Sequence, residues 1–297
     1  MKVRKAVIPV AGFGTRFLPA SRSVPKVNFP VLDTPAIHYA VAEAAEAAIE
    51  HVVFVVSQGQ DAVRAYFDRI PELEKALEQR GEEAMLRRML AVSNMADISY
   101  VNQHPQLGLG HAVLTARAMV GDEPFAVFLP DDIIWSDTPT IGQMMEIFDD
   151  FESTVIGVKE VPDEMVPSLG IVDARPMEGR ISEVAGLVEK PSLAEAPSNL
   201  AIIGRYVLTS QVFEELERMP PGAGGEIQLT DALANMLSTQ KAYAYRFPGV
   251  HFDVGTPLGL LKASVYAALH REELAGELRE WMDGVLRSPG EGPAQGT

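Results

Sequence analysis

Residues 5–26 decide the fold, and they read Lys-Ala-Val-Ile-Pro-Val-Ala-Gly-Phe-Gly-Thr-Arg-Phe-Leu-Pro-Ala-Ser-Arg-Ser-Val-Pro-Lys. The short apolar run at the start of this stretch predicts a buried strand. Gly12 and Gly14 then clear side chains from a turn, so that backbone N–H groups can approach an anion closely. Arg16 and Lys26 bring two fixed cations to the same turn. The combination predicts a binding site for a nucleoside triphosphate.

Three better-known motifs do not fit this stretch. A dinucleotide fingerprint needs a third glycine where the chain has Phe17, and the sequence contains no Gly-Lys followed by Ser or Thr, as a P-loop requires. Ser23-Val-Pro-Lys26 spells S-x-x-K, but that motif needs both side chains on one helical face, and Pro25 breaks helices. For the glycines alone, an ordinary strand-to-helix turn remains open.

Composition restricts the class of protein. The 297 residues hold 25 Lys and Arg against 41 Asp and Glu, a net charge of −16, which argues against a nucleic-acid partner. No apolar run approaches the roughly 18 to 20 residues of a membrane span, so no membrane partner is expected. The chain has no cysteine, which excludes disulfides and thiolate nucleophiles. The first residues resemble a signal peptide, but Pro9 and Arg16 interrupt the apolar part, so we expect a first strand and a cytoplasmic protein.

The first half of the chain alternates apolar runs with helical patterns. Strands are predicted at 5–11, 51–57, 97–103 and 124–130, and helices at about 35–48, 61–92 and 110–119. Nearly continuous apolar strands separated by helices predict a parallel sheet that is covered on both faces. Ligands in such sheets lie beyond the carboxyl ends of the strands. The glycine turn, Gln103 and Asp131 all fall at such ends and are expected to line one cleft.

The second half changes to a mixed α/β pattern that extends the same sheet. It predicts strands at 153–161, 170–175, 180–189, 199–208 and 242–254, with helices near 139–150, 210–218 and 227–239. We expect one domain over 1–287, with a first half at 1–135 that carries the predicted nucleotide site, a second half at 136–256 and C-terminal helices at 257–287. The Pro- and Gly-rich residues 288–297 are expected to form a disordered tail. An apolar stripe on the C-terminal helices favours either a cover for the core or a contact in a homodimer or homotetramer.

The sequence also resembles a known family. Gly-x-Gly-Thr-Arg followed by Pro-Lys is the signature of the sugar-phosphate nucleotidylyltransferases, and the flanking residues are similar to the bacterial UTP–glucose-1-phosphate uridylyltransferase (UDP-glucose pyrophosphorylase) family. The blocks that carry the resemblance, in family order, are Gln103-x5-Leu109-Gly110-His111-Ala112, Leu129-Pro130-Asp131-Asp132, Val188-Glu189-Lys190-Pro191, Pro197-Ser198-Asn199-Leu200-Ala201, Gly222–Asp231 and Phe252-Asp253-Val254-Gly255. The resemblance implies a Rossmann-like, glycosyltransferase-A-like α/β fold with a mostly parallel mixed sheet flanked by helices.

The resemblance implies Mg²⁺-dependent transfer of a uridylyl group from UTP to α-D-glucose 1-phosphate, giving UDP-glucose and diphosphate. By resemblance, catalytic roles fall to Arg16, Lys26 and Lys190. Nucleotide binding falls to Ala11, Gly12, Gly14, Thr15, Gln103 and Gly108. Sugar binding falls to Gly170 and Glu189. A thymidylyltransferase, another hexose 1-phosphate, or a non-catalytic regulatory protein that binds nucleotide sugars remain as alternatives.

Two carboxylates are candidates for the metal. Asp131 follows a predicted strand, and Mg²⁺ prefers a few carboxylates together with substrate phosphates and water. Asp253, near another strand end, is the second candidate. For Asp132, a helix N-cap or loop carboxylate is the preferred interpretation. A lone histidine is more often structural, which favours a structural interpretation of His111 over contact with substrate.

The chain departs from its family at one position. The family's usual text after Pro-Lys is Glu-Met-Leu-Pro, whereas this chain has Val27-Asn28-Phe29-Pro30. The lost carboxylate predicts weaker discrimination between UTP and dTTP if position 27 borders the base. The alternative is that position 27 contacts the base only indirectly.

Overall fold

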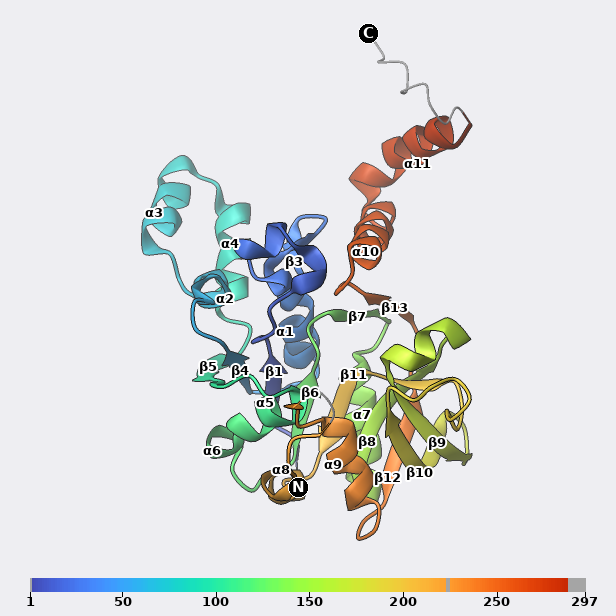
Figure 1. Cartoon of the computed structure of the whole chain (residues 1–297). Coiled ribbons are helices and arrows are strands. Elements are labelled where there is room, and N and C mark those ends of the chain that lie inside the picture. Colours follow the sequence, from blue (N-terminus) through green and yellow to red (C-terminus); the bar gives the residue numbers. More distant parts are fainter. Residues whose placement is uncertain (1, 223–224, 288–297) are drawn as a thin grey trace.

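A nine-stranded sheet forms the centre of the computed structural model, which describes residues 2–222 and 225–287 (Figure 1). In spatial order the strands are β5 (Asp97–Asn102), β4 (His51–Val56), β1 (Lys5–Pro9), β6 (Phe125–Phe128), β11 (Leu200–Leu208), β8 (Thr154–Glu160), β12 (Ala242–Arg246), β10 (Ile181–Glu189) and β9 (Gly170–Pro176). Smaller two-stranded sheets pair β2 (Pro30–Val31) with β3 (Thr34–Pro35), and β7 (Asp132–Trp135) with β13 (Val250–Asp253).

The sheet is mixed, with a parallel block in its first half. Strands β5, β4, β1 and β6 are all parallel, and within the described residues only β11 and β10 run against the direction of the others. Because β6 pairs directly with β11, the sheet continues from the first half into the second without a break. The predicted α/β fold with a mostly parallel mixed sheet is confirmed.

Helices cover both faces of this sheet because successive residues of its strands are apolar. Val7 of β1 packs into the apolar cluster on one face, while Ala6 and Ile8 pack into the cluster on the other. The first face is covered by α5 (Leu109–Thr115), α6 (Arg117–Val120), α8 (Gln211–Arg218) and α9 (Leu229–Met236). The second is covered by α1 (Ala36–Glu46), α2 (Asp61–Phe67) and α7 (Thr140–Phe151).

Several predicted elements differ from the structure, among them the helix at 110–119, which is divided into α5 and α6. The predicted helix 61–92 is divided into α2, α3 (Pro71–Arg80) and α4 (Glu83–Ser93), because Pro71 starts a helix and Gly81, at φ +71°, ends one. The predicted strand 242–254 is divided into β12 and β13, since Gly249 turns the chain at φ +106°. The strand predicted at 124–130 ends earlier, at Phe128.

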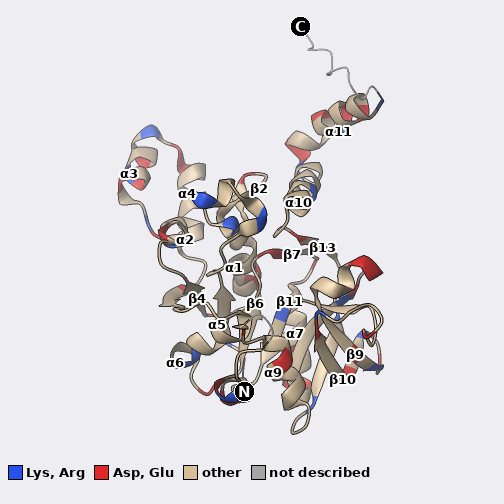
Figure 2. Cartoon of the chain, viewed as in Figure 1, with Lys and Arg blue, Asp and Glu red and all other residues tan. Residues whose placement is uncertain are grey.

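The C-terminal helices α10 (Pro257–Leu269) and α11 (Glu272–Arg287) extend away from the sheet (Figure 1). The inner side of α10 packs through Ala263 against Val31 and Ile133, which lie in the two small sheets. The Arg271 guanidinium forms a bidentate ion pair with Asp33 at 2.8 and 2.9 Å, and this pairing holds the pKa of Asp33 well below its usual range. The charged residues of the outer helices α3 and α11 are mostly acidic, with a few basic ones among them (Figure 2). No helix in the described part of the chain has the length and apolarity to cross a bilayer.

A buried ion pair connects the sheet to its helices. Arg205 of β11 is 1% exposed, and its Nε and Nη2 atoms donate to Glu43 Oε2 of α1 at 2.9 and 2.8 Å. The other oxygen of Glu43 accepts the backbone N–H of Ile141 at 2.9 Å, near the start of α7. The Arg205 Nη atoms also donate to three backbone carbonyls, those of Leu129, Gly204 and Asp132. One guanidinium therefore joins α1, α7, β11 and the turn after β6.

We expect Glu43→Gln to reduce the free energy of unfolding by about 3–5 kcal/mol, because it leaves the buried Arg205 charge unpaired. The measurement is equilibrium unfolding in urea. The double variant Glu43→Leu with Arg205→Met, which removes both charges, should recover part of this loss.

The matched control is Glu214→Gln, which removes one member of an exposed pair with Arg218 within α8. We expect a change of at most about 0.5 kcal/mol for this variant. Equal losses of unfolding free energy for Glu43→Gln and Glu214→Gln would contradict the prediction that the buried pair stabilises the fold more than the exposed pair does.

Candidate active site

The glycine turn after β1 presents unused backbone donors. No backbone N–H from Ala11 to Arg16 donates to any residue that the structure describes. Gly14 adopts a left-handed conformation at φ +63°, which glycine accepts without a steric cost. A Cβ atom added to Gly12 would meet nothing within 4 Å, so this side of the turn is open to a ligand. Consecutive free N–H groups of this kind form a cradle for an anion.

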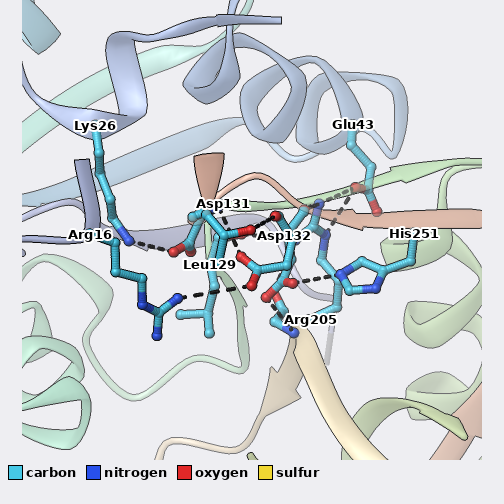
Figure 3. Close-up of polar contacts among 12 residues, drawn as sticks. Arg16, Lys26, Glu43, Leu129, Asp131, Asp132, Arg205 and His251 are labelled. Carbon is cyan, nitrogen blue, oxygen red and sulfur yellow. Dashed lines mark hydrogen bonds and ion pairs between the residues drawn. The ribbon is translucent and has the colours of Figure 1, made fainter. Parts of the chain in front are cut away.

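Two cations and two carboxylates face one another beside this turn (Figure 3). The ammonium of Lys26 forms an ion pair with Asp131, and Arg16 Nη1 lies 3.9 Å from Asp253 Oδ2. Burial acts to raise the pKa of Asp131, but the charge and hydrogen bond of Lys26, together with Arg16, turn the net shift downward. Burial and the negative charges of Asp132 and Asp131 raise the pKa of Asp253. The structure thus brings together four of the residues predicted from the sequence.

The donor set fits a magnesium ion that shares its coordination with a substrate. A Cβ atom added to Gly255 would lie 2.7 Å from Asp131 Oδ2 and 2.8 Å from Asp253 Oδ1, so these two oxygens converge on one small space. Among the described residues no group of three or more His, Asp or Glu side chains is placed to hold a metal. Two carboxylates completed by phosphate oxygens and water match the preference of Mg²⁺.

Asp132, next to the candidate metal ligand, has structural partners. The sequence predicts a helix N-cap or a loop carboxylate, and because Asp132 begins β7, the helix N-cap alternative is wrong. Its Oδ1 lies 2.6 Å from Nε2 of His251, and its Oδ2 accepts the backbone N–H of Gly204 at 3.2 Å. A Cβ atom on Gly204 would come within 2.5 Å of that oxygen, so only glycine allows this approach. Asp132 therefore joins β7, β13 and β11 beside Asp131.

A second group of polar residues follows β5. Gln103 is buried, and its Nε2 atom lies 3.1 Å from the carbonyl oxygen of Gly108 and 3.0 Å from Nδ1 of His111. Gln106 Nε2 donates to the carbonyl of Ala11 at 2.7 Å and so connects this group to the glycine turn. Parallel strands β1 and β5 end at the same edge of the sheet, which is why segments far apart in sequence meet here.

The loop that carries Gly108 is held by a distant segment. Ile227 N donates to Leu107 O at 2.7 Å, and Gly110 N donates to Ile227 O at 2.8 Å. A Cβ atom on Gly110 would lie 2.7 Å from Ile227 O, so this pairing requires glycine. The block around Ile227 thus acts as a support for the start of α5.

The candidate sugar-binding residues lie together at the ends of β9 and β10. Gly170 pairs with Glu189 in the sheet, and a Cβ atom on Gly170 would lie 3.3 Å from Glu189 Oε2. Lys190 adopts a left-handed conformation at φ +46°, unusual for a side chain of this size, and its Nζ lies 3.2 Å from Glu189 Oε1. Among the described residues, Lys190 makes no ion pair with the four residues at the glycine turn.

The pKa of one buried tyrosine, Tyr206, is affected both by a sugar-binding candidate and by a carboxylate next to Asp131. Burial, with the negative charges of Glu189 and Asp132, raises the pKa of Tyr206 well above its usual value, so both carboxylates lie within electrostatic reach of this phenol. Burial and Glu189 likewise raise the pKa of Asp231. The charge of Glu189 therefore acts on two neighbouring groups, Tyr206 and Asp231.

Sequence reasoning missed several residues that position the site. Arg205 had a signal, because it is the one charged residue in the strand Leu200–Leu208, which is otherwise apolar apart from a glycine and a tyrosine. No such signal marked Glu43, Gln106 and His251. Each is a polar residue among other polar residues, and its partner lies about 95 or more positions away in the sequence.

The side chain of Val27 lies in the apolar core. Its side chain is 2% exposed and packs in the apolar cluster with Val10 and Ile37, beneath the glycine turn. The side chain points into the core, which favours the alternative that position 27 contacts the base only indirectly. The neighbouring Asn28 donates through Nδ2 to the carbonyl of Ala62 at 3.2 Å, while its buried Oδ1 has no hydrogen-bond partner among the described residues.

Comparison with known proteins agrees with this geometry. The family model "Nucleotidyl transferase" matches residues 5–269, so the chain belongs to the nucleotidyl transferase family. A UTP–glucose-1-phosphate uridylyltransferase of Bacillus subtilis (strain 168) is 46% identical over 285 residues, 96% of this chain and 98% of the relative. A protein of the same name from Staphylococcus haemolyticus is 47% identical over 277 residues, 93% of this chain and 96% of the relative.

Solved structures lead to the same group. UTP-bound UDP-glucose pyrophosphorylase (UGPase) from Acinetobacter baumannii superimposes with a TM-score of 0.87 at 41% identity, covering 94% of this chain and 98% of that one. A UDP-glucose pyrophosphorylase complexed with UDP-glucose has a TM-score of 0.82 at 38% identity, with coverage of 91% and 100%. The resemblance that the sequence motifs indicated is confirmed.

We expect Val27→Glu to lower the free energy of unfolding by about 2 kcal/mol or more, because the carboxyl would enter an apolar cluster. Burial raises the folded-state pKa of such a carboxyl above its unfolded value. The folded state then binds more protons, so the destabilisation grows as the pH rises above about 4.3. Urea unfolding at pH 5 and pH 8, with Val27→Met as the control, measures this. A variant as stable as Val27→Met at pH 8 would show that position 27 is open to solvent.

Proposed function

We propose that this protein transfers the uridylyl group of UTP to α-D-glucose 1-phosphate, giving UDP-glucose and diphosphate. The observation that carries the proposal is the meeting of Arg16, Lys26, Asp131 and Asp253 beside a turn with free backbone N–H groups. The uridylyltransferases to which the chain is 46–47% identical over nearly its full length support this choice of substrates.

This chemistry requires no nucleophile from the protein. A phosphate oxygen of the sugar 1-phosphate attacks the α-phosphorus of UTP, and the bond from that phosphorus to the β-phosphate oxygen breaks as diphosphate leaves. Positioning and neutralisation of charge dominate the catalysis of such transfers. We assign Arg16 and Lys26, with the N–H groups of Gly12, Gly14 and Thr15, to the triphosphate and the leaving diphosphate.

The sugar phosphate falls to the residues at the ends of β9 and β10. Lys190 would bind its phosphate, and Glu189 would accept hydrogen bonds from hydroxyl groups of the sugar. Gly170 would let the sugar ring approach the backbone. Contacts among these three residues support the assignment. The negative charges of Glu189 and Asp132 also both raise the pKa of the buried Tyr206.

A divalent cation would complete the site. Asp131 and Asp253 would hold Mg²⁺, which when bound supplies positive charge between the two phosphate groups. Lys26 pairs with Asp131, and Arg16 lies near Asp253. We infer that these cations turn toward the phosphates as the carboxylates take up the metal ion.

The base falls to the group after β5. We assign the pyrimidine ring to the backbone at Ala11, Gly12 and Gly108 and to the side-chain amide of Gln103. Residues 1–135 then serve the nucleotide and 136–256 the sugar phosphate, within one domain that reaches residue 287. The single sheet that runs through both halves supports their assignment to one domain.

The setting of the enzyme completes the proposal. We place it in the cytoplasm, where UTP is available, as a homodimer or homotetramer. Leu258 and Leu261 on α10, and Trp281 and Leu286 on α11, are exposed and would be covered in such an assembly. Light scattering in solution measures the mass and tests this part.

We expect diphosphate release from UTP and glucose 1-phosphate that stops with excess chelator and returns with Mg²⁺. Asp131→Asn should lower kcat by roughly two orders of magnitude, because a principal stabiliser of the transition state is lost. A matrix of UTP, dTTP and CTP against several hexose 1-phosphates, read by diphosphate release, measures both. Full turnover in chelator, or near-normal turnover by Asp131→Asn, would contradict the metal assignment.

Gly255→Ala tests the same assignment without changing a charge. Its methyl group would occupy the space between Asp131 Oδ2 and Asp253 Oδ1 and force both carboxylates apart. We expect kcat to fall by about 100-fold, as small misplacements of catalytic groups cause, and direct Mn²⁺ binding, followed by its paramagnetic signal, to weaken.

Gly276→Ala on α11 is the matched control, because its Cβ atom would meet nothing within 4 Å. That variant should retain turnover and metal binding. Unchanged Mn²⁺ binding in Gly255→Ala would move the metal away from the two aspartates.

A further inference from the structure

In the side-chain amide of Gln103, the nitrogen has hydrogen-bond partners, but the oxygen has none among the described residues. Its Nε2 atom lies 3.1 Å from Gly108 O and 3.0 Å from His111 Nδ1, so each hydrogen of the amino group has an acceptor. The oxygen, Oε1, accepts no hydrogen bond from any residue that the structure describes. Because the carbonyl of Gly108 can only accept, the nitrogen must be the atom that faces it. One carbonyl oxygen is therefore left to face a ligand.

His111 can serve as the second acceptor only in one state. Its Nδ1 must carry a lone pair, which places the ring proton on Nε2 and leaves the imidazole neutral. Burial lowers the pKa of His111, which favours this neutral form at pH 7. The ring belongs to α5, whose first turn is fixed by the bond from Gly110 N to Ile227 O at 2.8 Å.

The other acceptor is equally fixed. Gly108 adopts φ +93°, and a Cβ atom there would lie 2.9 Å from Glu226 Cβ and 3.0 Å from Ile227 O. Gly108 and His111, the two acceptors for the amide, therefore both lie in the segment that the backbone of Ile227 supports. A rotated amide would turn Oε1 toward two acceptors and lose both hydrogen bonds, whereas without His111 it would lose only one.

A fixed carbonyl oxygen distinguishes pyrimidines. The N3 atom of uracil carries a hydrogen that such an oxygen accepts, while the N3 atom of cytosine carries a lone pair that repels it. An amide that rotates freely could present its amino group to cytosine instead. Discrimination therefore depends on what holds the amide, as well as on the amide itself.

We propose that His111 is a positioning residue that holds the Gln103 amide with Oε1 toward the base and thereby sets the preference for uracil over cytosine. The proposal rests on the proposed function in one respect, that the base binds beside Gln103.

The test compares variants with and without an acceptor at the position of Nδ1. His111→Phe keeps a ring but no acceptor, and His111→Leu is a second acceptor-free variant if the first does not fold. His111→Asn restores an acceptor, because its Oδ1 lies about where Nδ1 lay. Thr115→Val is the control, since Thr115 bonds the backbone carbonyl of His111 at 2.8 Å and not the ring.

The readout is the ratio of dissociation constants for CTP and UTP, measured by calorimetry at pH 7.5 without sugar phosphate, with the melting temperature recorded for each variant. We expect this ratio to fall about tenfold or more in the acceptor-free variants. It should stay within about threefold of the wild-type ratio in His111→Asn and Thr115→Val. Equal weakening for both triphosphates, or a loss in His111→Asn as large as in His111→Phe, would show a structural role only and overturn the proposal.

Gln103→Leu separates this proposal from the one on which it rests. If that variant loses the preference while His111→Phe keeps it, only the role of His111 is overturned. If Gln103→Leu binds UTP and CTP as the wild type does, the base lies elsewhere and both assignments are wrong. Because binding is measured without turnover, a failure of the transfer reaction itself does not affect this reading.

Discussion

The buried ion pair of Arg205 and Glu43 is the interaction on which the rest of the structure depends. A charge taken out of water is costly unless its hydrogen-bonding capacity is met, and here the guanidinium donates to one carboxylate and three carbonyls. Two of those carbonyls, Leu129 and Asp132, flank the turn that carries Asp131. The cost of burying the charge is thus offset only when the turn has its observed shape. The acidic site inherits its geometry from this requirement.

The site balances its own charges in a protein that is strongly acidic overall. With a net charge of −16, the chain has few cations to spare, and two of them lie beside Asp131 and Asp253. The residues proposed to neutralise phosphates are thus the partners of these carboxylates. Under the proposed function, binding of a polyphosphate together with a divalent cation would exchange partners within one cluster, so that no charge would be left unpaired.

The close approach of one chain segment to another is the second constraint. Glycine meets it where segments that are distant in sequence come into contact. Gly110 meets Ile227, Gly204 meets Asp132, and Gly255 meets both metal-candidate aspartates. In each case a methyl group would enter space already occupied by a neighbour. The glycines in these blocks therefore serve contacts in the tertiary structure, whereas Gly12 has open space beside it and is free to serve a ligand.

The sequence by itself determined the α/β class, the parallel first half and the candidate residues at strand ends, because apolar runs and glycine turns are local signals. Arg205 was missed, although its place in an apolar strand is a local signal; its partner has no such signal. Only the tertiary structure decided that Val27 lies in the core, that 61–92 forms three helices, and that Glu43, Gln106 and His251 support the site. The physical reason is that a residue's partners and the direction of its side chain depend on strand order and register. Those are fixed by packing among segments up to about 160 positions apart, which no local pattern encodes.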